Sequence, residues 1–184
     1  MFVSKCFVVS FGLFFGLVAA APIELPSEQL VKRGPTNAVK PNHMAQAVKV
    51  ANKIRTNLKT DPDKAVFWSG TRQGKKGPVS VKDDAARFAK QEGKETINMA
   101  LKKSNIKIPT EQQNPHSTRL WDFASKVWAK EAEGETHAVL GGTVRPASVY
   151  NKIEKPELLK NDKVTKLTEH NVDTKGKTVV KGGK

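Results

Sequence analysis

Apolar residues recur at helical spacing in three stretches of the chain, which we expect to form its longer helices. These stretches cover residues 42–59, 80–92 and 119–133, and the last two are followed by Gly93 and Gly134, which should end the helices. The residues expected to cap the three helices are Asn42, Ser80, and Ser117 or Thr118. The pattern therefore predicts three amphipathic helices that each bury one face.

Short apolar runs between and after these helices predict strands, at Ala65–Trp68, Thr136–Leu140 and Lys163–Leu167. Thr96–Leu101 is expected to add a short helix, and the basic stretch Gly74–Pro78 is expected to be a flexible loop. Helices come first and strands are then mixed with helices. We therefore predict an α+β fold, in which N-terminal helices pack with a small mixed sheet.

The start of the chain has the pattern of an export signal. Residues 1–20 resemble a secretory signal peptide, with Lys5 followed by an apolar run that ends in small residues. Residues 21–33 follow as a pro-segment and end in the dibasic pair Lys32-Arg33, which a processing protease would cut. We therefore expect a secreted protein whose mature chain begins at Gly34. The apolar run is too short to cross a bilayer comfortably, so we expect no membrane span.

The remaining chain is long enough for one domain, which we assign to residues 34–172. Residues 173–184 are rich in lysine and glycine. Segments of that composition cannot bury much apolar surface, so we expect a basic tail that is loosely ordered at best.

Charge and cysteine content narrow the possible chemistry. Lys and Arg total 32 against 18 acidic residues, a net charge of +14 that favours anionic ligands or surfaces. The lysines do not alternate with aromatic residues, so we expect no specific nucleic-acid binding. The only cysteine, Cys6, lies in the signal peptide, which excludes disulfides and cysteine catalysis in the mature chain. The four histidines lack the spacing of metal ligands, so we expect no metal.

Residues 145–154 concentrate the candidate chemistry, directly after Gly141-Gly142. Pro146 suits the first position of a short helix, whose unpaired backbone N–H groups favour an anion. Arg145 adds a guanidinium beside it, and Glu154 is a lone carboxylate further along. The stretch alone fits either the site of a nucleotide-cleaving enzyme or a charged surface loop.

The tryptophans also allow two interpretations. Trp68 and Ser69 end a predicted strand, where an indole stacks on a flat ring and a hydroxyl binds ribose or phosphate, or where both residues are structural. Trp121 and Trp128 share one face of the third predicted helix. Both are expected in the core, although one of them at the edge of a pocket is also consistent with the pattern.

Four segments, taken in order, resemble the family of ADP-ribosyl cyclases and NAD glycohydrolases. They are Ala65-Val-Phe-Trp-Ser69, the stretch from Ala85 to Leu101, the stretch from Leu120 to Leu140, and the stretch from Ala147 to Leu167. The family includes animal ecto-enzymes and disulfide-free bacterial toxin domains. Because the mature chain lacks disulfides, it is closest in character to the toxin-type members.

The resemblance implies an ADP-ribosyl cyclase-like fold, with NAD as substrate and neither cofactor nor metal. Glu154 would stabilise positive charge at the anomeric carbon, although Tyr150 occupies the position of the family's glutamate and Glu154 fits with a short insertion. Asn98 stands where the family has an acid that influences cyclisation, so we do not predict cyclisation. The substrate-binding residues that the resemblance implies are Trp68, Ser69, Arg72, Trp121, Arg145, Ala147 and Ser148.

The function predicted from the sequence is therefore a secreted NAD glycohydrolase that acts as a toxin or effector. Its partners would include NAD and a host factor, a target-cell factor or an immunity protein. One alternative is a non-catalytic basic protein that binds an anionic surface or a host partner. Another is an ADP-ribosyltransferase, which would label a macromolecule.

Overall fold

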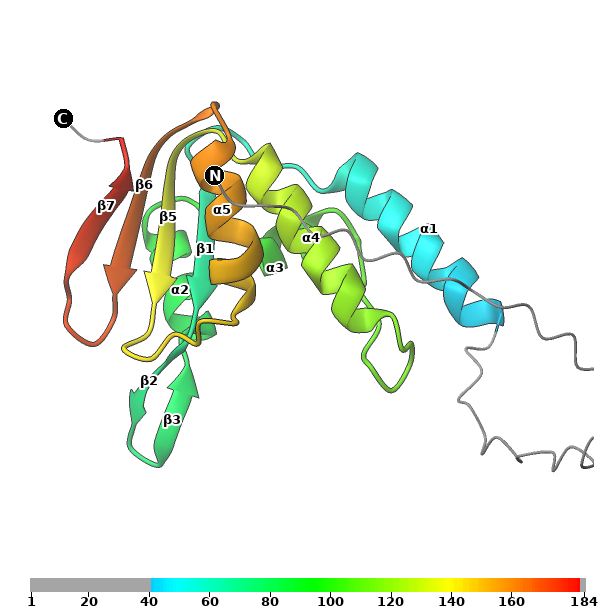
Figure 1. Ribbon diagram of the computed structural model, residues 1–184, viewed down its shortest axis with the longest axis horizontal. Helices are drawn as coiled ribbons and strands as arrows, with labels where there is room; N and C mark the ends of the chain where they lie inside the picture. The colour runs from blue at the N-terminus through cyan, green and yellow to red at the C-terminus, as the bar shows by residue number, and fades with distance from the viewer. Residues whose placement is uncertain (1–40, 183–184) are drawn as a thin grey trace, which may run out of the picture. The chain divides into compact units, whose positions relative to one another are not determined.

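A five-stranded mixed sheet forms the centre of the computed structural model, which describes residues 41–182 (Figure 1). Its spatial order is β4 (Glu95–Thr96), β1 (Ala65–Ser69), β5 (Gly134–Leu140), β6 (Val164–Asn171) and β7 (Lys177–Lys181). The first four run parallel, and β7 pairs antiparallel with β6. The predicted mixed sheet is confirmed, whereas the expected signal peptide and pro-segment, residues 1–20 and 21–33, lie outside the described residues.

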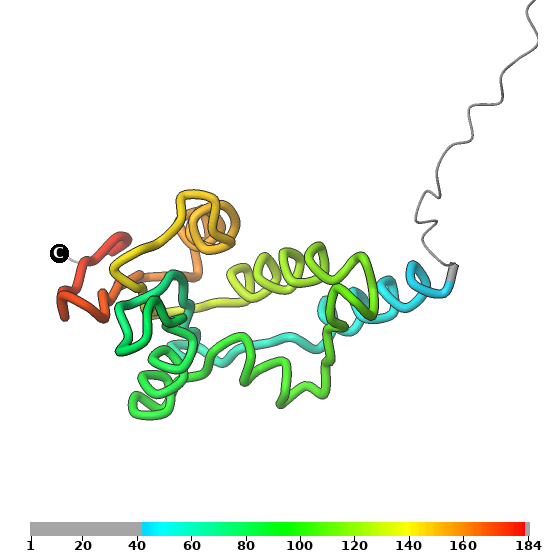
Figure 2. The backbone as a smooth tube through the Cα atoms, turned by 90° about the horizontal axis from the view of Figure 1, so that it is seen from below, coloured from blue at the N-terminus to red at the C-terminus, as the bar shows by residue number. Residues whose placement is uncertain are grey.

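The alternation of side chains along β1 creates two cores. Val66 points to one face, where it packs with Ala85 and Ala89 of helix α2 (Lys82–Gln91). Phe67 points to the other face and contacts Trp128 of helix α4 (Ser117–Glu131), with ring centroids 6.5 Å apart. Turn η1 (Tyr150–Glu154) and helix α5 (Lys155–Lys160) share that second face. Figure 2 shows α2 and α5 on opposite sides of the strands.

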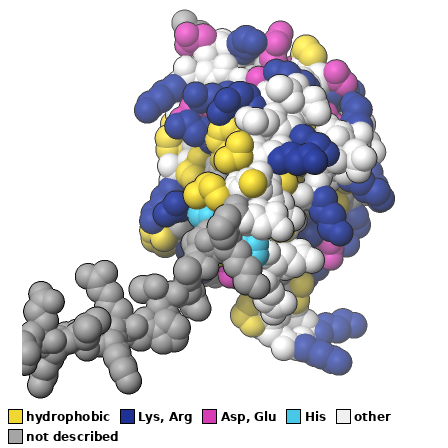
Figure 3. Space-filling view, turned by 90° about the vertical axis from the view of Figure 1, so that its right-hand side faces the viewer, with side chains coloured by type: hydrophobic (Ala, Val, Ile, Leu, Met, Phe, Trp, Pro, Cys, Tyr) yellow, Lys and Arg dark blue, Asp and Glu magenta, His cyan; other side chains and the backbone are white. Residues whose placement is uncertain are grey.

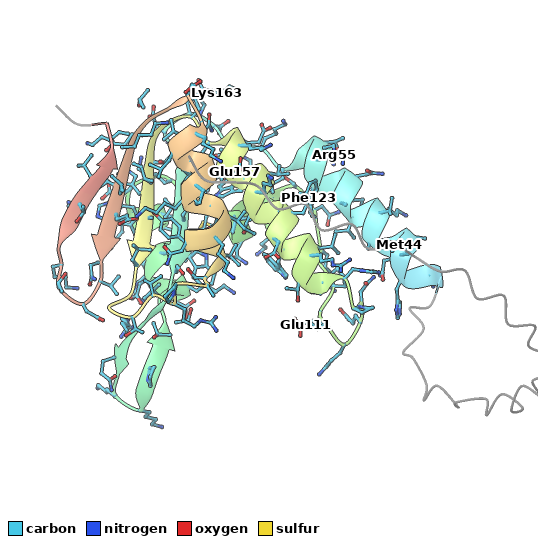
Figure 4. The ribbon with its side chains drawn as sticks, viewed as in Figure 1. Met44, Arg55, Glu111, Phe123, Glu157 and Lys163 are labelled. Atoms are coloured by element: carbon cyan, nitrogen blue, oxygen red, sulfur yellow. The ribbon has the colours of Figure 1, made fainter. Side chains whose placement is uncertain are left out.

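Helix α1 (Pro41–Asn57) packs on α4, which separates it from the sheet (Figure 4). Ile54 is fully buried in this contact region, and the Arg55 guanidinium lies 5.9 Å from the centre of the Phe123 ring. The helix agrees with the predicted range, but it begins at Pro41, so Asn42 is not its cap. Proline is favoured in the first turn because the missing N–H would have no partner there.

The segment expected to be a flexible loop, Gly74–Pro78, instead forms a hairpin. Strand β2 (Thr71–Gly74) pairs antiparallel with β3 (Gly77–Ser80) around the Lys75-Lys76 turn. Gly77 adopts a φ of 120°, a conformation that residues with a side chain rarely adopt. The prediction was wrong because the glycines that suggested flexibility supply the backbone geometry of a tight turn.

The prediction that the C-terminal tail is loosely ordered was also wrong for the residues that the structure describes, which extend to residue 182. The Asn171 side chain accepts hydrogen bonds from the N–H groups of Asp173 and Thr174, which reverses the chain. Strand β7 then pairs with β6, and Val180 packs against the core. Its lysines are typical of an edge strand that avoids further pairing. Because lysine-rich composition is also typical of disordered tails, composition alone did not predict the strand.

Helix ends agree in part with the predicted caps. After α2, Gly93 has a φ of 62°, and the Lys94 N–H donates to the Ala89 carbonyl at 2.6 Å, as in a Schellman motif. Ser80 accepts a hydrogen bond from the Lys82 N–H at 3.3 Å, although Val81 holds the cap position. The short helix α3 (Ile97–Lys103) follows β4 as expected. Gly134 begins β5 rather than directly ending α4.

The part of the chain that the structure describes contains no helix both long and apolar enough to cross a membrane. Over the face drawn in Figure 3, Lys and Arg side chains are scattered among acidic and apolar ones. On that face the excess positive charge is spread over the surface and does not form a single basic patch.

We expect Phe67→Ala to lower the free energy of unfolding by about 3–5 kcal/mol, because the ring is buried on one face of the sheet against Trp128. Urea denaturation would measure the loss. The matched control is Val79→Ala on the exposed face of the hairpin, with an expected change below about 0.5 kcal/mol. Equal losses in the two variants would contradict this account of the core.

Candidate active site

A cavity of about 580 Å³ opens at the carboxyl ends of β1 and β5. These neighbouring parallel strands continue in opposite directions, since the chain leaves β1 for β4 and leaves β5 for β6. The chain therefore proceeds from the two strands toward opposite edges of the sheet, which makes the ends of β1 and β5 a topological switch point. Ligands of open α/β sheets bind in crevices at such points.

The cavity brings together most of the residues that the sequence predicted for the site. Two of them come from the end of β1, one from α4, and three from the segment that follows β5. They are Trp68, Ser69, Trp121, Arg145, Ser148 and Glu154. Arg72 and Ala147 are not part of the cavity wall.

Gly70 determines how the two loops meet at the cavity. It has a φ of 91°, and a side chain there would collide with the carbonyl oxygen of Thr143. The close approach allows Thr71 and Thr143 to exchange backbone hydrogen bonds of 3.0 and 3.2 Å. The hairpin that follows β1 is thereby fixed to the loop that follows β5.

Arg72 is directed away from the cavity by an ion pair. Its Nε donates to Oδ2 of Asp84 on α2 at 2.7 Å, and this hydrogen bond raises the pKa of Arg72. Arg87 also binds Asp84 from the following turn of α2. Arg72 thus holds the hairpin against α2, and Arg145 is the remaining predicted guanidinium that lines the cavity.

The helix after the cavity loop starts later than predicted. Pro146 and Ala147 form an exposed turn, and helical structure begins at Val149. The Ser148 hydroxyl accepts the Asn151 N–H at 3.3 Å, which caps this start. The Ser148 N–H donates to the Arg145 carbonyl at 2.9 Å. This backbone group was expected to bind an anion, but it already has a partner within the loop.

Glu154 ends a π turn that Pro156 explains. Proline has no N–H for the carbonyl four residues earlier, that of Lys152, and its ring would collide with that carbonyl. The backbone instead widens, and the Lys155 N–H donates to the carbonyl of Tyr150. Wide turns of this kind are frequent at functional sites. The Glu154 carboxyl lies at the cavity wall with only 6% of the residue exposed.

Burial raises the pKa of Glu154 to about 7, because the ionised form loses water contacts. The Ser125 hydroxyl favours the ionised form and offsets part of this effect. Near neutral pH, the carboxyl therefore exists in both protonation states. A carboxyl with this property in a cavity is a candidate for stabilising positive charge or for proton transfer.

Tyr150 and Lys155 attach the π turn to the sheet. The Tyr150 hydroxyl donates to Oε1 of Glu169 on β6 at 2.8 Å, and Lys155 Nζ binds the same oxygen at 2.8 Å. Burial, followed by the hydrogen bond to Glu169, raises the pKa of Tyr150. Residues at the start of the turn and just after its end are thereby held, which fixes the segment that carries Glu154.

Sequence reasoning assigned no role to several residues of the cavity wall. Ser125 lies four residues after Trp121 on α4, so helical spacing alone places both on one face. Thr143 lies in the loop after β5 and Ser80 ends β3, and their approach depends on contacts between distant segments. Spacing could have identified Ser125, whereas no local pattern indicates the other two.

No protein-family model and no curated protein matches the sequence, but the chain is similar to several solved structures. Aplysia cyclase complexed with the substrate NGD and the product cGDPR has 21% identity and a TM-score of 0.45, with 72% of this chain and 65% of that chain covered. A CD38 covalent enzyme–substrate complex has 19% identity and a TM-score of 0.46, covering 80% and 73%. Porcine CD38 with a covalent intermediate has 18% identity and a TM-score of 0.45, covering 67% and 69%.

This chain thus spans 65% of the length of the Aplysia cyclase chain. The activities named for those proteins remain statements about those proteins.

We expect the difference in free energy of unfolding between Glu154→Gln and the wild type to change in favour of the variant as pH rises from 4.5 to above 7. In this window the unfolded glutamate loses its proton while the folded one retains it, so the wild type loses stability. The difference should reach about 1–3 kcal/mol, since each unit of pKa is worth 1.36 kcal/mol. Urea denaturation at several pH values would measure it, with Glu157→Gln on the same helix as control. A difference that does not vary with pH would contradict the burial argument.

Tyr150→Phe should cost about 1–2 kcal/mol of stability, because it removes the hydrogen bond to Glu169 and leaves the ring in place. A double-mutant cycle with Glu169→Gln, measured by urea denaturation, isolates the interaction. The coupling energy between the two positions should be about 0.5–2 kcal/mol. Strictly additive losses would show that the hydroxyl and the carboxylate do not act together.

Proposed function

We propose that this protein is a secreted NAD glycohydrolase, which cleaves NAD to nicotinamide and ADP-ribose. One observation carries the proposal: a single cavity holds a buried carboxyl of raised pKa, a half-buried indole and a guanidinium. These groups are Glu154, Trp68 and Arg145. The resemblance of four sequence segments to the ADP-ribosyl cyclase and NAD glycohydrolase family supports the same activity.

The chemistry follows from the charge that develops on the substrate. When the bond between the anomeric carbon and the nicotinamide nitrogen breaks, its electron pair goes to nicotinamide and the ribose becomes oxocarbenium-like. An ionised Glu154 stabilises this cation, and the interaction is strong because the carboxyl is almost completely buried, where water screens charges weakly. Water then adds to the anomeric carbon and releases a proton. The products are nicotinamide, ADP-ribose and a proton.

The other residues of the cavity would hold the substrate in position. Trp68 stacks on the nicotinamide ring, which is flat and positively charged in NAD. Ser69 and Ser148 offer hydroxyls to the ribose, and Trp121 adds a second indole to the cavity wall. Arg145 is placed to neutralise the diphosphate, because Arg72 is already paired with Asp84.

The biological role as a toxin or effector belongs to the same proposal. It is supported by the signal-peptide pattern of residues 1–20 and by the absence of disulfides in the expected mature chain. A secreted enzyme that consumes NAD would act on a target cell, with a host or target-cell factor or an immunity protein as partner. The net charge of +14 favours attraction to anionic surfaces.

Incubation with NAD, followed by chromatography, tests the proposal. The wild type should release nicotinamide and free ADP-ribose, and Glu154→Gln should lower kcat by about 100-fold or more. Glu157→Gln, which changes an acid on the adjoining turns of the same helix, should retain activity. The rate should rise as pH increases through about 7, because the ionised form of Glu154 is the active one.

Each alternative has its own signature in this assay. Intact NAD with a folded wild type would favour the non-catalytic binding protein. Transfer of labelled ADP-ribose to a macromolecule would favour the transferase. Full turnover by Glu154→Gln would remove Glu154 from the mechanism while leaving the activity itself established.

A further inference from the structure

A second cavity, of about 330 Å³, adjoins the first one. The two cavities share Asn98 and Trp121, so these residues form the boundary between them. The end of α3, the loop that follows it and α4 make up the wall of the second cavity. Its apolar lining residues are Leu101, Ile106 and Ile108, and its cationic ones are Lys102 and Lys107.

The boundary between the cavities contains an unsatisfied polar group. Oδ1 of Asn98 is buried and has no hydrogen-bond partner among the described residues. A buried acceptor without a partner is costly. Trp121 is half-buried beside it, which leaves an indole surface for a ligand that extends from one cavity into the other.

The distribution of charge also favours an extended ligand. Arg145 is the only cation among the described residues that line the first cavity. A diphosphate carries two negative charges at neutral pH, and one guanidinium at the rim balances half of them. Lys102 and Lys107 of the second cavity add two ammonium groups, which suit phosphate oxygens.

We propose that the second cavity is a subsite for the phosphate-bearing nucleoside half of a dinucleotide. Lys102 and Lys107 pair with the phosphates, and the apolar wall accepts the face of the base. Trp121 lies where the two halves of the substrate meet. The inference rests on the proposed function for the reaction in the first cavity. It adds the place where the phosphate-bearing nucleoside half of that substrate binds and the two lysines that hold it.

The first test compares NAD with nicotinamide riboside, which has the same scissile bond but no phosphate. The double variant Lys102→Ala/Lys107→Ala should lower kcat/KM for NAD about fivefold to tenfold, as expected for two exposed charge pairs. It should leave kcat/KM for the riboside unchanged. Equal losses for both compounds, or no loss for NAD, would overturn the proposal.

The control is Lys90→Ala/Lys163→Ala, which removes the same charge at a distance from the cavities. Lys90 lies in the last turn of α2, and Lys163, which Figure 4 labels, directly precedes β6. Both are exposed, and both lie toward the amino ends of the strands. A loss of NAD turnover in this control, as large as in Lys102→Ala/Lys107→Ala, would mean that net charge alone accounts for the effect.

The second test does not depend on turnover. Titration with AMP, followed by tryptophan fluorescence, should show binding that weakens about fivefold in Lys102→Ala/Lys107→Ala and persists in Glu154→Gln. Adenosine, which lacks the phosphate, should bind equally to the wild type and to Lys102→Ala/Lys107→Ala. If NAD is not cleaved but AMP binding depends on the lysines, the proposed reaction fails and the subsite stands. If AMP does not bind, or binds independently of the lysines, the subsite is wrong.

Discussion

The candidate site depends on an interruption in the regular α-helical hydrogen bonding around Glu154, which is caused by Pro156 two residues later. The missing N–H and the bulk of the proline ring force the backbone into a π turn, in which the Lys155 N–H reaches the Tyr150 carbonyl. The sequence resemblance placed Tyr150 at the family's glutamate position and required an insertion before Glu154. The wide turn changes the direction of the side chains that follow it, and both Tyr150 and Glu154 line the cavity.

Holding a carboxyl in this position has a cost in stability, which the surrounding contacts offset. Glu154 is almost completely buried, and its charged form is disfavoured there. The second core of the protein supplies the opposing contribution, since Leu158 of the same helix and Tyr150 of the turn are buried within it. A helix anchored by these contacts can carry an unfavourable group without unfolding. Functional residues are commonly supported in this way.

Local patterns in the sequence predicted the elements that bury one face by themselves. The spacing of apolar residues located α1, α2, α4, β1 and β5, and Gly93 correctly marked the end of α2. The hairpin and β7 were missed because both depend on pairing with a partner, and their Gly and Lys content is also typical of loops. Secondary-structure propensity describes a segment in isolation, whereas an edge strand forms only when a neighbouring strand is available to pair with it.

The same distinction explains which site residues could be found. Trp68, Ser69 and Glu154 were identified from strand ends and from a resemblance, and the cavity contains all three. Arg72 was assigned to the substrate from the family resemblance. The sequence did not reveal that Asp84, on another element, binds it. An arginine has the same chemistry for a carboxylate as for a phosphate, so its true partner depends on the tertiary structure.

Two carboxylates near the π turn illustrate how environment separates structural from chemical roles. Glu169 accepts both the Tyr150 hydroxyl and the Lys155 ammonium, so its hydrogen-bonding capacity serves to hold the turn. Glu154 faces the cavity with Ser125 as its polar neighbour, and burial raises its pKa to about 7. Glu169 is thus engaged by two donors that hold the turn, whereas Glu154 has no cationic partner among the described residues and is available for the role proposed for it. The fold thus uses one acid to position the other.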